Sequence, residues 1–418
     1  MDWERFQIPA KYAALDALVM ADCAATFSEI EDIRDFNQLK VLSAFIECRV
    51  GSQHMQGSTG YGYGDVGRDM LDRVFARAVG AEDSLCRTHF MSGTHAITVA
   101  LFGLLRKEMT MLSVTGEPYE TLKSALGLRG PGFGSLDEYG IRYNQIELHE
   151  GSPDLSAIAE KATEVELIYI QRSRGYGARR AMTLEDIGEI TASAKSANKD
   201  VIVVVDNCYG EFTEKDEPLS CGADIIIGSL IKNPGGGVAE TGGYIAGRKD
   251  LVELIANRLS APGVGRGIGS NPAGHRNAYL GLYMAPQVTA EALKSAVYVS
   301  RLFERLGYET DPKYDARRSD VITSVSLGNE RALSLFCRAL QSSSPVDSYA
   351  TPEASEMPGY DGKVIMAAGA FTAGSSIELS ADAPAEAPYL VYVQGGLNLI
   401  ASRLAFLRAA SLLEKEGF

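Results

Sequence analysis

A lysine and an aspartate near the middle of the chain have the residue types and spacing that pyridoxal phosphate (PLP) chemistry requires. Asp206 ends the apolar strand pattern VIVVVD, and Lys232 follows a second such pattern, DIIIGS, by three residues. A lysine amine forms the Schiff base with PLP, and an aspartate keeps the pyridinium nitrogen charged. Ligands of open α/β sheets bind beyond the carboxyl ends of the strands, so both residues are expected in one site. Taken alone, Lys232 is more typical of a solvated loop, and Asp206 is as typical of a turn or a helix N-cap.

A phosphate site is predicted where Ser92, Gly93 and Thr94 stand between a strand pattern and a helix pattern. Free backbone N–H groups and the positive end of a helix dipole bind dianions at such a position, although Ser92 or Thr94 serves equally well as a plain N-cap. Ser229 is placed to hydrogen-bond a phosphate oxygen, and the glycine run that follows lets the backbone approach a ligand. Tyr119 is predicted to stack on the pyridine ring, where simple packing is as common.

The composition of the 418-residue chain is that of a globular protein, with 45% hydrophobic and 22% charged residues. This length favours two domains over one compact core. A net charge of −14, with acidic and basic residues mixed along the chain, argues against binding of nucleic acids or anionic membranes. The six cysteines form no C-x-x-C pair and are typical of reduced thiols rather than a zinc site. The N-terminus lacks a signal-peptide pattern and no apolar run reaches membrane-span length, so a soluble cytoplasmic protein is expected.

Hydrophobic periodicity divides the chain into three parts, which are a helical N-terminal segment (1–56), a large domain (57–285) and a small domain (286–418). The large domain begins with a glycine- and tyrosine-rich connector and continues with alternating strands and helices, which predict a mainly parallel sheet covered by helices. Its expected helices are 68–79, 94–106, 120–126, 155–162 and 184–196, and its expected strands are 84–90, 111–114, 145–148, 167–171, 201–205 and 224–227.

The small domain is predicted to have a smaller α+β architecture. Its expected helices are 289–306, 330–341 and 398–414, and its expected strands are 321–327 and short segments near Val364, Ile377 and Leu390.

Several segments carry a family resemblance, namely GYGYGDVGRDMLDRVFARAVGAE, SGTHAI, SVTGEPYETL, IQRSRGY, VVVDNCYGEF, SLIKNPGGG and SIELSAD followed by VYVQGGL. They resemble the PLP-dependent enzymes of the aspartate-aminotransferase fold that act in cysteine and methionine metabolism, the cystathionine lyases and methionine gamma-lyase. The chain is most similar to the aluminium-resistance-protein branch of that superfamily, over nearly its whole length. The resemblance implies an α/β PLP-binding domain with a mainly parallel seven-stranded sheet between helices, plus a smaller α+β C-terminal domain.

The same resemblance implies roles for individual residues. Lys232 corresponds to the Schiff-base lysine and Asp206 to the partner of the pyridine nitrogen. The phosphate-binding residues correspond to Gly93, Thr94 and Ser229.

The connector is implied to act across a subunit interface. In the lyase families a Tyr-x-Arg in this region reaches the phosphate of the neighbouring subunit. Here Tyr61 and Tyr63 are present without an arginine two residues later, and Arg68 is the nearest one. The resemblance therefore implies a homodimer or homotetramer with shared active sites, in which Tyr61 and Tyr63 help to bind the cofactor.

Two departures from the lyase pattern affect the substrate. Ile231 precedes the lysine where the lyases have threonine, and Glu378 lies where they have the arginine that binds the substrate carboxylate. Arg172, Arg174 and Arg266 are the candidate substitutes for that arginine, and each is nearly as typical of a surface ion pair.

These residues together predict a PLP-dependent carbon-sulfur lyase. Lys232 would move the proton at Cα, and a thiol-type group would leave from a methionine, cystathionine or cysteine-type substrate. The alternative is a PLP-dependent aminotransferase, racemase or aldolase that acts on another amino acid. Two further hypotheses are a PLP-binding protein without catalysis and a dinucleotide-dependent oxidoreductase that uses GYGDVG (62–67), although no strand pattern precedes that motif.

Overall fold

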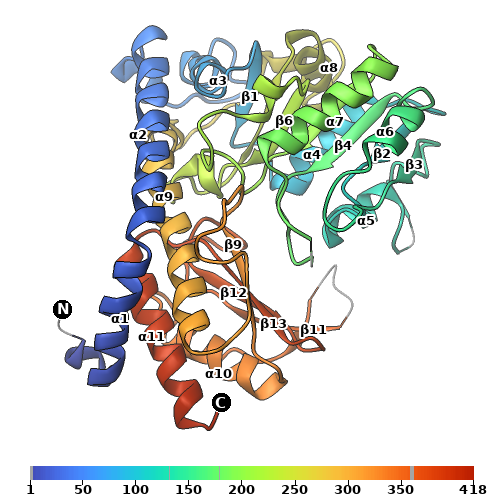
Figure 1. Ribbon diagram of the computed structural model, residues 1–418. Coiled ribbons are helices and arrows are strands. Elements are labelled where there is room, and N and C mark those ends of the chain that lie inside the picture. The colour runs from blue at the N-terminus through green and yellow to red at the C-terminus, as the bar shows by residue number, and fades with distance from the viewer. Residues whose placement is uncertain (1–2, 131, 178, 358–361) are drawn as a thin grey trace. The chain divides into compact units, whose positions relative to one another are not determined.

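The computed structural model describes residues 3–130, 132–177, 179–357 and 362–418 (Figure 1). The chain forms two compact units, one of residues 36–286 and one that combines residues 1–35 with residues 287–418. The expected N-terminal segment is thereby divided after Asp35. No helix in the described part of the chain is long and apolar enough to cross a membrane.

The unit of residues 36–286 is built on a seven-stranded sheet with the strand order β1-β7-β6-β5-β4-β2-β3. Six strands run in one direction, and β7 is antiparallel to both of its neighbours. The mainly parallel seven-stranded sheet is thus confirmed. The strands are β1 (Asp83–Arg87), β2 (Thr110–Ser113), β3 (Arg142–Gln145), β4 (Leu167–Gln171), β5 (Ile202–Asp206), β6 (Ile225–Ser229) and β7 (Gly243–Gly247).

Strand β7 was not expected from the sequence, because its residues GYIAG include few good strand formers. Residues 230–242, which connect it to β6, contain a 3-10 turn at Asn233–Gly235 but no α-helix. A parallel return requires a longer crossover, so β7 pairs antiparallel with β6. This short return holds Lys232 close to the end of β6.

Helices cover both faces of this sheet (Figure 1). One face packs against α3, α6 and α7 together with parts of α2 and α9, and the other packs against α4, α5 and α8. The central strands β4, β5 and β6 are apolar and almost entirely buried, as strands covered on both faces must be. The helices are α2 (Ala24–Glu47), α3 (Val66–Val79), α4 (Gly93–Leu104), α5 (Glu120–Leu126), α6 (Leu155–Ala162), α7 (Leu184–Ala197), α8 (Lys249–Leu259) and α9 (Arg276–Arg305).

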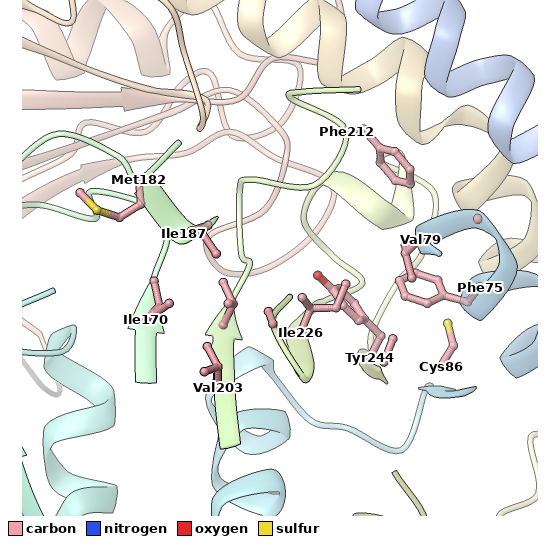
Figure 2. Packing of buried hydrophobic residues seen from close by; sticks show 14 of the residues in the cluster. Phe75, Val79, Cys86, Ile170, Met182, Ile187, Val203, Phe212, Ile226 and Tyr244 are labelled. Carbon is pink, nitrogen blue, oxygen red and sulfur yellow. The ribbon is translucent and has the colours of Figure 1, made fainter. Parts of the chain in front are cut away.

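Aromatic and aliphatic side chains fill the layer between α3 and the sheet. Figure 2 shows Phe75 and Val79 beside Tyr244, and the ring centroids of Phe75 and Tyr244 lie 4.5 Å apart. Val203 and Ile226 project from neighbouring strands into the same layer and are fully buried. The core therefore fixes the central strands whose ends carry the expected site.

The unit of residues 1–35 and 287–418 contains a six-stranded antiparallel sheet with the order β10-β11-β12-β13-β9-β8. Its N-terminal helix is held by Asp16, which accepts hydrogen bonds from Trp3, Tyr298 and Arg403. This buried cluster explains why residues 1–35 belong with the C-terminal part. The elements are α1 (Ala10–Asp22), β8 (Thr310–Asp311), β9 (Ile322–Ser326), α10 (Glu330–Gln341), β10 (Ser355–Glu356), β11 (Lys363–Ala367), β12 (Ser380–Pro384), β13 (Leu390–Gln394) and α11 (Leu399–Lys415).

Three expected elements differ from the structure. The strand expected at 145–148 is β3, at Arg142–Gln145, because an edge strand tolerates polar residues. No strand forms at Ile377, since the chain bends there and its carbonyl accepts a hydrogen bond from the backbone of Gly396. Helix α9 begins well before the expected position and includes Pro286.

Candidate active site

The alternation of side chains along the strands determines which residues meet at the carboxyl edge of the sheet. Val204 and Ile227 pack in the layer formed with α4, α5 and α8. Asp206 and Ser229 come two residues later on the same two strands, so their side chains lie on that same face. The face that carries them is therefore the one covered by α4, which begins with the predicted phosphate loop.

Asp206 is buried, with 4% of its surface exposed. Its carboxylate accepts hydrogen bonds from the Tyr169 hydroxyl (3.2 Å) and from the Cys208 backbone N–H (3.1 Å). Burial raises the pKa of Asp206, and the charge of Lys232 lowers it in part. A cationic partner would complete the stabilisation of this carboxylate.

Lys232 follows β6 and precedes the 3-10 turn Asn233–Gly235. Its Nζ lies 4.1 Å from the centroid of the Tyr209 ring. Burial disfavours the ammonium form, but the acidic groups of the site outweigh burial and raise the pKa of Lys232 above its ordinary value. Lys232 and Asp206, which lie at the ends of adjacent strands, thus affect each other electrostatically.

The start of α4 approaches β6 very closely. A Cβ atom placed on Gly93 would lie 3.3 Å from Cys208 Sγ and 3.4 Å from Ser229 Cβ. Ser92 is the N-cap of α4, because its hydroxyl accepts a hydrogen bond from the His95 backbone N–H (3.1 Å). Backbone N–H groups at the start of this helix and the Ser229 hydroxyl therefore border one small region that suits an anion.

Thr94 and Tyr119 extend this region. The Tyr119 hydroxyl donates to Thr94 Oγ1 at 3.1 Å, and Thr94 Oγ1 lies 3.1 Å from Thr121 Oγ1. The Tyr119 backbone N–H donates to Gln171 Oε1 at 2.9 Å. Tyr119 packs against the core on the face covered by α4, α5 and α8. Burial raises the pKa of Tyr119, and the charge of Asp206 raises it further.

The contacts described above do not connect Tyr61 or Tyr63 to the residues around Lys232. They are 70% and 75% exposed, and their ring centroids lie 5.5 Å apart. Arg68 is buried in its own chain, where it donates to the Gly62 carbonyl and pairs with Asp69. The connector therefore presents two exposed aromatic rings, and Arg68 is held away from solvent.

The three arginines suggested as substrate-carboxylate ligands occupy different environments. Arg172 is fully buried, with its Nη2 atom 3.0 Å from Glu214 Oε1 and its Nη1 atom 3.7 Å from Glu217 Oε2. Arg266 pairs with Asp83 at 2.5 Å and donates to the Ser84 carbonyl. Both guanidinium groups are thus committed to structural ion pairs.

Arg174 is also buried, and its guanidinium contacts the Gly177 carbonyl. Glu378, in the SIELSAD segment, accepts hydrogen bonds from the backbone N–H groups of Phe371 and Thr372 and so shapes a loop.

Sequence reasoning missed several residues of the site. Tyr169 and Gln171 share a face of β4, where one holds Asp206 and the other holds Tyr119. Their spacing of two in a strand next to β5 is the signal that would have identified them. Cys208 and Tyr209 follow Asp206 directly, and only the turn geometry shows that they face Gly93 and Lys232.

Known proteins match this chain over nearly its whole length. The family profile described as methionine gamma-lyase matches residues 13–414. YnbB of Bacillus subtilis (strain 168), an uncharacterized protein, is 44% identical over 402 residues, which are 95% of this chain and 96% of that protein.

Solved structures share the whole fold. A carbon-sulfur lyase involved in aluminum resistance from Clostridium novyi is 47% identical, with a TM-score of 0.94 over 98% of this chain and 97% of that one. A Listeria monocytogenes protein, provisionally named a cystathionine beta-lyase involved in aluminum resistance, is 46% identical, with a TM-score of 0.94 over 96% of this chain and 100% of that one.

The fold alone is shared with the pyridoxal-5'-phosphate-dependent protein YhfS of Escherichia coli, at a TM-score of 0.63 and 17% identity over 91% of this chain and 97% of that one. The seven-stranded sheet and its helix layers are thus a fold that a PLP-dependent protein also has. The chain belongs to the methionine gamma-lyase family.

The ion pairs of Arg172 predict a structural role. Replacing Arg172→Met leaves Glu214 and Glu217 buried without their cation, which should lower the free energy of unfolding by about 3–5 kcal/mol in urea titrations. The control Arg77→Met removes an exposed pair with Glu47 and should change stability little. A stable Arg172→Met protein with a raised KM for amino acids would instead identify Arg172 as the carboxylate ligand.

Proposed function

We propose that this protein is a PLP-dependent carbon-sulfur lyase that eliminates a thiol-type group from a sulfur amino acid of the methionine, cystathionine or cysteine type. The single observation that carries the proposal is the placement of a buried carboxylate, Asp206, and of Lys232 at the carboxyl ends of adjacent strands. Membership of the methionine gamma-lyase family supports the same reaction class.

The residues present suit PLP in each of its functional parts. The cofactor has a dianionic phosphate, a ring nitrogen that is most useful when protonated, and an aldehyde that reacts with an amine. Gly93, Thr94 and Ser229, with the Ser92 cap, border the region that suits an anion. Asp206 provides the buried carboxylate and Lys232 the amine.

PLP, when bound, supplies an electron sink that stabilises negative charge at the substrate Cα. Asp206 would remain ionised beside a protonated ring nitrogen, because an opposite charge lowers a carboxyl pKa that burial has raised. Tyr119 is held at both its hydroxyl and its backbone N–H, so its ring is fixed for stacking against the cofactor.

Lys232 is the candidate acid and base of the reaction. Its amine, when released from the cofactor, would take the Cα proton and return a proton to the substrate or the leaving group. The flexible four-carbon stem permits such movement, whereas the strand end fixes its Cα. The role of Lys232 therefore depends on its position after β6.

Replacement of Lys232 tests the cofactor assignment. Wild-type protein should be yellow, and borohydride reduction should attach the cofactor to the peptide that contains residue 232. Lys232→Ala should be colourless, and it should give no such peptide in mass spectrometry. The control Lys161→Ala, which removes an exposed lysine paired with Glu164, should behave like wild type. Covalent cofactor on another lysine of Lys232→Ala would contradict the assignment.

The reaction itself is tested with methionine, cystathionine and cysteine as separate substrates. A lyase should release a thiol, ammonia and a ketoacid in equal amounts, because elimination yields an unstable imine that water hydrolyses. In the presence of an acceptor ketoacid that takes the amino group, ketoacid formed from the substrate without thiol or ammonia would indicate an aminotransferase. Inversion at Cα would indicate a racemase. Threonine serves as an added substrate, because aldol cleavage requires a hydroxyl on Cβ, and release of an aldehyde and glycine from it would indicate an aldolase. Any of these outcomes would replace the lyase proposal.

The variant Asp206→Asn tests the role of the carboxylate in the same assay. Asp206→Asn keeps the shape of the side chain but removes its charge, and we expect kcat to fall roughly 100-fold or more. Retention of full activity would show that the carboxylate does not support the ring nitrogen.

We also propose that the protein is a homodimer or homotetramer in which Tyr61 and Tyr63 bind the cofactor of a neighbouring subunit. Two aromatic rings that are mostly exposed in one chain, beside a buried arginine, support this arrangement. The free thiols of all six cysteines support a cytoplasmic location.

Subunit mixing tests the shared site. A protein with Tyr61→Ala and Tyr63→Ala and a protein with Lys232→Ala should each be impaired. After random exchange of subunits between the two proteins, about one quarter of the sites should contain Lys232 from one subunit and both tyrosines from its neighbour. Light scattering gives the number of subunits, and a mixture that gains no activity after exchange would place the two tyrosines outside the neighbouring site.

A further inference from the structure

Tyr209 has an unusual backbone conformation directly beside Lys232. Its φ angle is 67°, in the left-handed region that residues other than glycine seldom adopt. The side chain is 6% exposed, and its ring centroid lies 4.1 Å from Lys232 Nζ. Strained conformations of this kind persist only where the surrounding structure enforces them, and they are frequent at functional sites.

Hydrogen bonds around Asn207 enforce the turn that carries Tyr209. The Asn207 backbone N–H donates to the Ile227 carbonyl at 2.9 Å, and the Gly210 N–H donates to the Asn207 carbonyl at 2.8 Å. Arg172 Nη1 donates to Asn207 Oδ1 at 2.7 Å. A Cβ atom on Gly210 would lie only 2.5 Å from Arg172 Cδ, so the guanidinium stem packs directly against the turn.

The loop that carries Lys232 is tied to the same turn. Asn233 is fully buried, and its side-chain amide donates to the Glu211 carbonyl at 2.9 Å. Asn233, next to Lys232, and Glu211, two residues after Tyr209, are therefore joined by a direct hydrogen bond. This bond limits how far the amine and the ring can move apart.

Several titratable groups face Lys232, and they differ in charge. Burial raises the pKa of Cys208 well above its usual range and that of Glu211 to about 8, so both are mostly protonated at neutral pH. Burial also raises the pKa of Tyr119, which leaves Asp206 as the carboxylate that faces the ammonium. Lys232 Nζ lies over the face of the Tyr209 ring, 4.1 Å from the ring centroid.

We propose that Tyr209 is a positioning residue for Lys232, whose ring holds the free ε-ammonium group at the end of β6 by a cation–π interaction. The ring would thus hold the amine whenever it is not bonded to the cofactor. The inference rests on the proposed role of Lys232, and it assigns a function to the strained turn. The negative face of an aromatic ring favours the charged form of an amine close to it.

The test measures the pH at which Lys232 loses its proton in the full-length chain after cofactor has been removed with phenylhydrazine. An amine-reactive acylating reagent modifies only the neutral amine, and mass spectrometry gives the extent of modification at residue 232. Tyr209→Leu should lower the pH of half-modification by about one unit, since it removes the ring. Tyr209→Phe, which keeps the ring, should behave like wild type.

Incorporation of trifluorophenylalanine at position 209 covers the case in which Tyr209→Leu fails to fold. This residue keeps the size of the ring but weakens its negative face, so the pH of half-modification should fall as it does for leucine. An unchanged pH in both variants, or an equal fall in Tyr209→Phe, would overturn the proposal.

The outcome is distinguishable from a failure of the lyase proposal. Recovery of the yellow colour after PLP is added back reports on cofactor binding, whereas acylation of the cofactor-free chain reports on Tyr209 alone. A chain that never binds PLP but shows the shift would support the role of Tyr209 and contradict the proposed function.

Discussion

The parallel register of β4, β5 and β6 is the constraint on which the site depends. Gln171 pairs with Asp206, and Asp206 pairs with Ile227, so the three strands end at nearly the same level. Since side chains alternate between faces, a shift of one residue would turn the Asp206 carboxylate towards the opposite helix layer. The apolar residues of these strands pack into the helix layers on both faces, and this packing fixes the register of the strands. The register in turn determines the face towards which each polar residue at a strand end points.

A second layer of polar residues lies behind the site and supports it. Arg172, Glu214 and Glu217 are buried together, and Asn207 contacts both Arg172 and Glu217. Taking these charges out of water is costly, and their mutual contacts offset the cost only when all partners are present. The turn after β5 is consequently held by a buried cluster of charged and amide side chains.

Much of the fold followed from the sequence, because apolar runs and helix periodicity reflect burial directly. Helices such as Leu155–Ala162 and strands such as Leu167–Gln171 have the expected bounds. The arginines could not be assigned in this way, since Arg172 and its partner Glu214 are 42 positions apart and a sequence does not reveal that they meet. The position of Tyr209 could not be predicted for a related reason. It results from a left-handed backbone conformation that the types of the neighbouring residues do not indicate.

The close approach of Gly93 to Cys208 and Ser229 has a consequence for reading related sequences. The start of α4 lies so close to β6 that a methyl group at position 93 would contact both neighbours at once, more tightly than is usual. A larger residue at this position in a related chain would require Cys208, Ser229 or the start of the helix to shift. Position 93 therefore offers a simple criterion, readable from an alignment, for whether a related chain keeps this close approach of α4 to β6.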